Sequence, residues 1–251
     1  MSQAKRKGHL MNAINPLPKL DQGRQVWARP AYRILERAHV SVSELFAASS
    51  ALGTARRKAN SSPTGRNSVS EVDILRSAIV MTSAGLDASM KLLVNEAGRE
   101  LISRGAAGAC GAYRQHLKRE MSKPRVSDPF RQAVMADDPG KGLLKFYLRE
   151  RTKASFQGSG DLVVRVKGVL GISNSEVPDS VLKQLDPFFK ARNKIVHQMD
   201  LEDPEKKKDS VKRVHRDTEV VARQCNEVFE VAVRLIRGAS SECWRAGSRR
   251  K

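Results

Sequence analysis

The segment from about residue 70 to residue 104 constrains the fold most, because it carries the strongest helical pattern in the chain. Its apolar side chains recur at helical spacing and form a broad face: Ile74, Ala78, Met81, Gly85, Met90, Leu93 and Ala97. Ser70, with Asp73 three residues later, is typical of a helix start of the capping-box kind. The glycines of "GAAGACG" follow directly. The sequence therefore predicts one long helix that begins at Ser70 and ends near Arg104.

The rest of the chain predicts further helices and no β-sheet. Residues 30–57 carry apolar side chains at helical spacing and predict one or two helices. Shorter helices are expected at 110–121, 129–136, 140–152 and 161–171, then a helical stretch from Pro178 that Pro187 kinks or restarts, and a final long helix at about 210–238. No strand alternation, hairpin signal or internal repeat is present, so we expect an all-α fold.

Clusters of Pro, Gly, Ser and Asn divide the chain into segments. The clearest linker is "KANSSPTGRN". The expected organisation is a basic flexible arm at 1–29, an N-terminal helical segment at 30–57, a linker at 58–69, a helical domain at 70–238 and a basic C-terminal tail at 239–251. We therefore expect a helical bundle with an extra N-terminal helix and short helical insertions.

The charge of the chain indicates a polyanionic partner. The 251 residues carry a formal net charge of +19, and the sequence pI is about 10.3. Nucleic acid is the commonest partner of so basic a protein. A membrane surface is the weaker alternative, because no basic amphipathic helix with an aromatic apolar face stands out. No secretory signal or uninterrupted transmembrane stretch is recognisable, so we expect a cytoplasmic protein without a membrane partner.

The cysteines and acidic residues give no sign of a metal or another cofactor. Cys110, Cys225 and Cys243 are isolated, without the paired spacing of a zinc site or a disulfide framework. No HExxH motif or carboxylate cluster is present either. We therefore expect chemistry that needs no cofactor.

The segment "FFKARNKIVHQMD", residues 188–200, places polar groups in an apolar helical pattern. On a continuous helix, one stripe would contain Leu182, Leu185, Phe189, Arg192 and Val196, so that Arg192 interrupts an apolar face. Asn193 and His197 are four residues apart and share the adjacent face. Arg192 and His197 lie about 140° apart around the helix. Because a buried unpaired guanidinium is unfavourable, Arg192 should face a partner subunit, a groove, an acidic residue or an anionic ligand.

The chemistry available to these three side chains suits the cleavage of RNA. Arg192 can hold phosphate oxygens and stabilise the charge that develops on them. His197 can transfer a proton near neutral pH, and Asn193 can orient the imidazole or bind an oxygen atom. A base that deprotonates a ribose 2′-hydroxyl allows that oxygen to attack the adjacent phosphorus without a metal.

Two motifs resemble those of HEPN-domain proteins, which are helical bundles with an R-x4–6-H motif. "RNKIVH" fits the R-N-x3-H form of this motif, and "LRSAIVMTSAGLDAS" at 75–89 is similar to an early helix of the RiboL-PSP-HEPN branch. The resemblance implies a HEPN-like bundle over about residues 70–238. It gives the motif roles to Arg192, Asn193 and His197, and it matches Asp87 to the acidic position of the early helix.

The resemblance also implies an activity and partners. Many such proteins are metal-independent endoribonucleases in which the Arg and His of two subunits meet across a homodimer interface. Some are toxins, paired with an antitoxin, or components of anti-phage defence, and others bind RNA or a partner protein without catalysis. Several of the toxins carry Tyr where this chain has Met199, which puts control by modification at that position in doubt.

Other interpretations of the same residues stay open. Arg192 could pair with Asp87 for stability alone, Asp87 could pair with Lys91, and His197 could complement the helix dipole. Arg33 with His39 is a second match to the spacing, without the Asn. The protein could thus be an endoribonuclease, a catalytically silent HEPN module, or a basic helical nucleic-acid-binding protein unrelated to HEPN.

Overall fold

The computed structural model describes residues 13–20, 26–59, 66–203, 205 and 212–248, and the regular elements in them are all helices. The all-α prediction is therefore confirmed. The helices are α1 (Arg29–Ala59), α2 (Val69–Ser103), α3 (Ala107–Met121), α4 (Asp128–Val134), α5 (Pro139–Thr152), α6 (Ser159–Asp161), α7 (Gly168–Leu170), α8 (Asp179–Lys183), α9 (Asp186–Gln198) and α10 (Thr218–Ser248), with a 3-10 turn η1 (Val26–Ala28) and a π-helical segment η2 (Leu162–Lys167). The β structure in these residues is one isolated bridge between Leu201 and Arg213.

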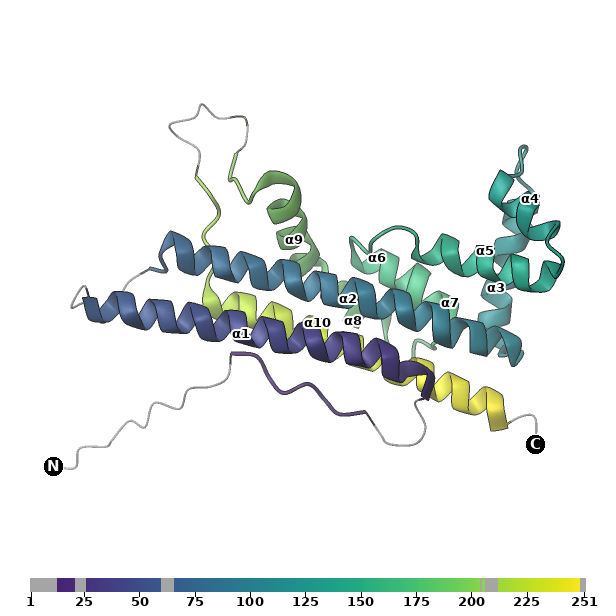
Figure 1. Cartoon of the computed structure of the whole chain (residues 1–251), viewed down its shortest axis with the longest axis horizontal. Coiled ribbons are helices and arrows are strands. Elements are labelled where there is room, and N and C mark those ends of the chain that lie inside the picture. Colours follow the sequence, from purple (N-terminus) through teal and green to yellow (C-terminus); the bar gives the residue numbers. More distant parts are fainter. Residues whose placement is uncertain (1–12, 21–25, 60–65, 204, 206–211, 249–251) are drawn as a thin grey trace.

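Three long helices, α1, α2 and α10, form the frame of the molecule and lie side by side (Figure 1). Helix α1 runs antiparallel to α2 and packs on it so closely that a Cβ on Gly85 would lie 2.2 Å from the Cβ of Ala38. Glycine at position 85 therefore sets the spacing of the two helices. The N-terminal helical segment and the domain expected to follow it share one core.

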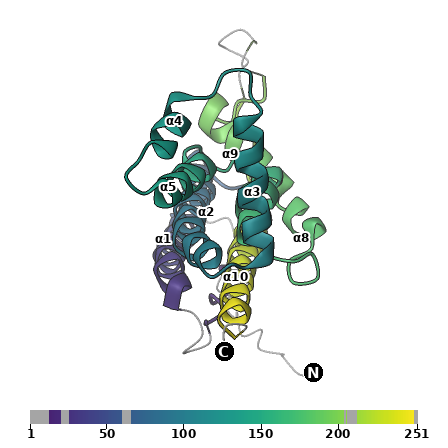
Figure 2. The ribbon, with the colours of Figure 1, turned by 90° about the vertical axis from the view of Figure 1, so that its right-hand side faces the viewer.

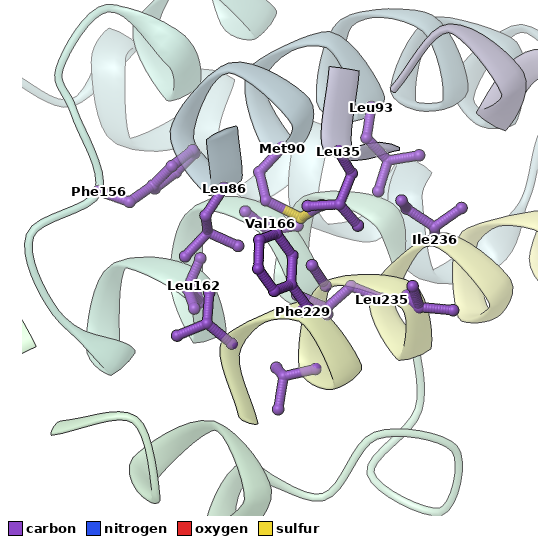
Figure 3. Packing of buried hydrophobic residues seen from close by; sticks show 14 of the residues in the cluster. Leu35, Leu86, Met90, Leu93, Phe156, Leu162, Val166, Phe229, Leu235 and Ile236 are labelled. Carbon is purple, nitrogen blue, oxygen red and sulfur yellow. The ribbon is translucent and has the colours of Figure 1, made fainter. Parts of the chain in front are cut away.

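The core lies where α1, α2 and α10 face the short helices between α5 and α8. Figure 3 shows side chains from α1, α2, η2, α10 and the loop before α6 packed together, among them Leu35, Leu86, Met90, Phe156, Leu162, Val166, Phe229 and Ile236. Helices α3, α4 and α5 project from one end of the frame (Figures 1 and 2) and share a small second cluster around Phe130, Ala133 and Phe146.

The N-cap of helix α2 lies two residues before the one that the sequence predicts. The N-cap is Ser68, whose hydroxyl accepts a hydrogen bond from the Glu71 amide at 3.3 Å, while the Glu71 carboxylate accepts one from the Ser68 amide at 2.7 Å. Asp73, expected to complete the cap, instead forms ion pairs with Arg76 and Arg213. The capping pair predicted at Ser70 and Asp73 is therefore wrong, while the helix itself begins at Val69, one residue from the expected start.

Among the described residues, α2 is also the one helix that is long and apolar enough to cross a membrane. Its most apolar 18-residue window has a mean hydropathy of 1.3, and 56% of that window is buried inside the bundle. These buried side chains already have packing partners within the chain.

Helix α10 is displaced from the expected range of 210–238. It begins at Thr218, where the Asp217 carboxylate accepts hydrogen bonds from the amides of Glu219 at 2.9 Å and Val220 at 3.1 Å. It continues to Ser248, with Cys243 and Ala246 buried. Most of the expected basic tail is therefore helix, and its last residues, 249–251, lie outside the described residues.

Part of the expected N-terminal arm packs on the bundle. The Asn15 amide donates to the side-chain oxygen of Asn226 at 2.9 Å, the Asn226 side chain donates to the Ala13 carbonyl at 3.0 Å, and Ile14 is buried. Residues 13–20 are thus attached to α10. The rest of the expected arm, at 1–12 and 21–25, and residues 60–65 of the expected linker lie outside the described residues.

Candidate functional site

Helix α9 carries the candidate site on its outer face. The chain turns between α8 and α9, and α9 then buries Phe188, Ala191 and Ile195 against the bundle. Arg192 is partly exposed and Val196 is 45% exposed. The first part of the predicted stripe, Leu182, Leu185 and Phe189, is buried. Its continuation through Arg192 and Val196 is wrong, because the buried face of α9 instead follows Ala191 and Ile195.

Arg192 and Asn193 form a pair that is attached to a loop. The Arg192 Nη1 atom donates to the Asn193 Oδ1 atom at 2.9 Å, and the Asn193 Nδ2 atom donates to the Gln157 carbonyl at 3.2 Å. Arg192 forms no ion pair with any carboxylate in the described part of the chain. Asn193 thus fixes the guanidinium and leaves its positive charge uncompensated.

Asp87 supports the same loop from the opposite side. Its Oδ1 atom accepts from the Phe156 amide at 2.8 Å, and its Oδ2 atom pairs with Lys91 at 2.7 Å. Asp87 and Asn193 therefore hold adjacent residues of the loop between α5 and α6. Among the interpretations left open, the geometry fits the pairing of Asp87 with Lys91 and not a pairing with Arg192.

Arg165, in the π-helical segment η2, holds this loop in place. Its Nε atom donates to the Arg151 carbonyl at 3.0 Å, its Nη1 atom donates to the Ser155 carbonyl at 3.2 Å, and its guanidinium lies 4.5 Å from the centre of the Phe156 ring. A π-helical turn changes the direction of the side chains it carries, and such turns are frequent at functional sites. The loop that receives Asn193 is therefore firmly supported.

The side chain of His197 is exposed on α9, and its imidazole forms no hydrogen bond with the other described residues. Neighbouring apolar side chains are exposed as well, with Val196 at 45% and Met199 at 65%. Arg192 and His197 point about 140° apart around the helix, so α9 alone does not direct both at one atom. Within the described residues, the imidazole thus has no hydrogen-bonding partner.

The end of α9 is anchored by a buried charge cluster that the sequence analysis did not predict. Asp200 is fully buried with a left-handed backbone (φ 62°), and its carboxylate pairs with the Nε atoms of Arg76 and Arg216, each at 2.9 Å. The Asp200 carbonyl also accepts from the Val214 amide at 2.8 Å. The cluster therefore fixes the backbone three residues after His197.

Of these unpredicted residues, Arg76 had a signal in the sequence. It lies between Leu75 and Ile79 on the buried face of α2 and is only 5% exposed. A cation in an apolar helical stripe needs a partner, and the argument made for Arg192 applies to Arg76. The positive φ of Asp200 and the π-helical turn at Arg165 leave no comparable pattern.

The remaining candidate residues have structural roles. In the second match to the motif spacing, the His39 ring contacts the Asn15 carbonyl at 2.8 Å and packs edge-on against Phe229. Burial raises the pKa of the Cys225 and Cys243 thiols to about 12, so neither is a reactive thiolate. No group of three or more His, Cys, Asp or Glu side chains able to hold a metal ion gathers in the described residues.

Comparisons with models of protein families, with curated proteins and with solved structures found no match to this chain.

Proposed function

We propose that this chain is a metal-independent endoribonuclease of the HEPN type, with Arg192, Asn193 and His197 as its catalytic residues. The observation that carries the proposal is the state of Arg192, a guanidinium held by Asn193 that no carboxylate of the described residues neutralises. A fixed, uncompensated cation suits a phosphate substrate, and an accessible imidazole lies on the same helix. The net charge of +19 supports a polyanionic substrate, and RNA provides the hydroxyl that the reaction needs.

The proposed reaction is a transesterification. A neutral imidazole of His197 takes the proton of the ribose 2′-hydroxyl, and the 2′-oxygen forms a bond to the adjacent phosphorus. The bond from phosphorus to the 5′-oxygen breaks, and an acid returns a proton to that oxygen. The products are a 2′,3′-cyclic phosphate and a 5′-hydroxyl. Arg192 stabilises the charge on the non-bridging oxygens, and Asn193 keeps the guanidinium in position.

A second copy of the chain would complete the site. Arg192 and His197 lie about 140° apart on α9, so a homodimer in which each α9 faces its partner would bring the Arg of one copy to the His of the other. The exposed Val196 and Met199 beside His197 support such an interface, because apolar side chains gain stability when a partner covers them. A cytoplasmic role in a toxin or anti-phage defence system, with an antitoxin or defence partner, belongs to the same proposal.

The proposal is tested by incubating RNA with wild-type protein, His197→Ala and Arg192→Ala in EDTA. We expect the wild type to cut RNA and to leave cyclic phosphate ends. General acid–base catalysis contributes roughly 100- to 10,000-fold, so His197→Ala should be slower by at least about 100-fold. Loss of wild-type activity in EDTA, or equal rates for wild type and His197→Ala, would contradict the mechanism.

One observation favours a second candidate function, a catalytically silent HEPN module that binds RNA. A catalytic histidine is usually oriented by a hydrogen bond to its second ring nitrogen, and His197 receives none from the described residues. A homogeneous protein that binds RNA and never cuts it, at any protein concentration, would favour this candidate.

A further inference from the structure

A hollow of about 660 Å³ lies next to the end of α9, and cationic side chains outnumber carboxylates in its lining. Its walls are the N-terminal end of α2 and the segment 212–215 that leads to α10. The basic residues that line it are Arg66, Arg76, Lys212, Arg213 and His215, whereas Glu202 is the one carboxylate in its lining. A hollow with this excess of positive charge suits an anionic ligand.

The cations of the hollow fall into two groups. Arg76 and Arg213 are part of the protein's own framework, because both pair with Asp73 and Arg76 also pairs with Asp200. Arg66 and Lys212 are exposed and pair with no carboxylate within the described ranges. Arg66 and Lys212 are therefore available to a ligand. The buried pair of Arg76 with Asp200 holds the neighbouring wall of the hollow in place.

The hollow also has an apolar side, formed by Val69 and Val72. Val69 is 71% exposed at the first residue of α2, and Val72 is buried behind it. Apolar surface beside cations matches a nucleotide, which offers the face of a base and a phosphate. The volume is in the range of pockets that hold a small organic ligand, so it suits one or two nucleotides of a single strand and not a duplex.

The hollow is connected to the candidate catalytic residues by a short path. The Arg213 Nε atom donates to the Met199 carbonyl at 3.1 Å, two residues beyond His197. The Val214 amide donates to the Asp200 carbonyl at 2.8 Å. One wall of the hollow is therefore built directly on the end of α9, and a strand that crosses His197 can continue into it.

We propose that this hollow is a subsite for single-stranded RNA, in which Arg66 and Lys212 bind backbone phosphates next to the scissile one. This inference rests on the proposed function for two points, the class of substrate and the direction in which the RNA strand leaves His197. It adds a binding site on residues outside the motif, formed by α2 and the segment before α10.

The test compares two double charge reversals in a His197→Ala background, so that the RNA stays intact. The double variant Arg66→Glu with Lys212→Glu alters the hollow and is called the hollow variant. Lys145→Glu with Arg149→Glu on α5 is the matched control, because it changes the net charge equally, both residues are exposed, and neither forms an ion pair with the described residues. Helix α5 packs at the other end of α2, where a Cβ on Gly98 would lie 3.1 Å from Leu148.

Binding is measured by fluorescence anisotropy with a labelled single-stranded RNA of about ten nucleotides over a range of salt concentrations. The hollow variant should bind at least about tenfold more weakly, and the slope of log K against log salt should fall by about 1.4 because two phosphate contacts are lost. The control should change affinity by about threefold or less, because salt screens distant charges. Circular dichroism should give equal melting temperatures for both variants.

Equal losses in the two variants, or an unchanged salt slope in the hollow variant, would overturn the inference. A separate cleavage assay keeps it distinct from the proposed function. If wild type never cuts RNA while the hollow variant alone loses binding, the nuclease proposal fails and the subsite stands. If wild type cuts RNA while the hollow variant binds like the control, only the subsite fails.

Discussion

Replacing Asp200 by Asn should destabilise the protein strongly, although Asp200 lies outside the motif. Asn tolerates the left-handed backbone at this position (φ 62°), so the substitution removes the charge and leaves the chain path intact. It leaves Arg216, whose side chain is 15% exposed, without its ion-pair partner. Arg76, 6% exposed, keeps Asp73 and the Val214 carbonyl. Breaking a buried ion pair costs roughly 3–5 kcal/mol, and the retained partners of Arg76 place the expected loss near about 3 kcal/mol.

For a chain of this size each kcal/mol lowers the melting temperature by about 2–4 °C, so Asp200→Asn should melt about 6–12 °C below wild type. The assay is thermal unfolding followed by far-UV circular dichroism. Asp128→Asn is the control, because Asp128 is 78% exposed and its nearest cation, Arg131, lies at 3.6 Å. Its melting temperature should change by about 2 °C at most. If the two variants have the same melting temperature, the cluster around Asp200 does not anchor α9 and the reasoning is refuted.

Further predictions concern single side chains. His197→Ala should leave the free energy of unfolding within about 0.5 kcal/mol of wild type in a urea titration, because the imidazole is exposed and unbonded. Met199→Gly should stabilise the monomeric chain by about 0.5–1 kcal/mol in a urea titration at low protein concentration, since Met199 has a left-handed backbone (φ 50°) and is 65% exposed. Burial, with the nearby Arg151 guanidinium, lowers the pKa of His116, so stability should be full above the pKa of the unfolded state and fall as the pH drops below it. Melting temperatures between about pH 7.5 and 5.5 should therefore fall more for wild type than for His116→Gln.

The long helices could be predicted because their periodicity is local, and their ends could not because these depend on distant residues. Two patterns of a serine followed by an acid three residues later stand at the start of α2, one from Ser68 to Glu71 and one from Ser70 to Asp73. Asp73 is drawn away by Arg76 and by Arg213, which lies far along the chain, so the first pattern forms the cap. A capping box favours Glu over Asp at its last position, so the first pattern carried the better local signal, whereas the contact of Asp73 with Arg213 had no local signal.

In the candidate site, too, the sequence identified local features and missed those that depend on distant residues. The sequence identified Arg192, Asn193 and His197 on one helix, and the structure places Arg192 and Asn193 in contact. It did not identify Asp200, because the reason for an aspartate there is a pair of arginines, one of them more than a hundred residues away. It also extended the buried stripe through Arg192 and Val196, whereas the buried face of α9 follows Ala191 and Ile195.

Helix α9 is fixed at two points that leave its outer face free. Asn193 attaches it to the loop that Asp87 and Arg165 support, and Asp200 attaches its end to α2 and to the segment before α10. Neither attachment uses the imidazole of His197 or a carboxylate partner for Arg192. Exposed Arg and His side chains are ordinary on a solvent-facing helix, and what distinguishes this face is that Asn193 holds Arg192 in place between the two attachments. Precise positioning of a reacting group requires such supports, so the arrangement favours a functional role for the face between them.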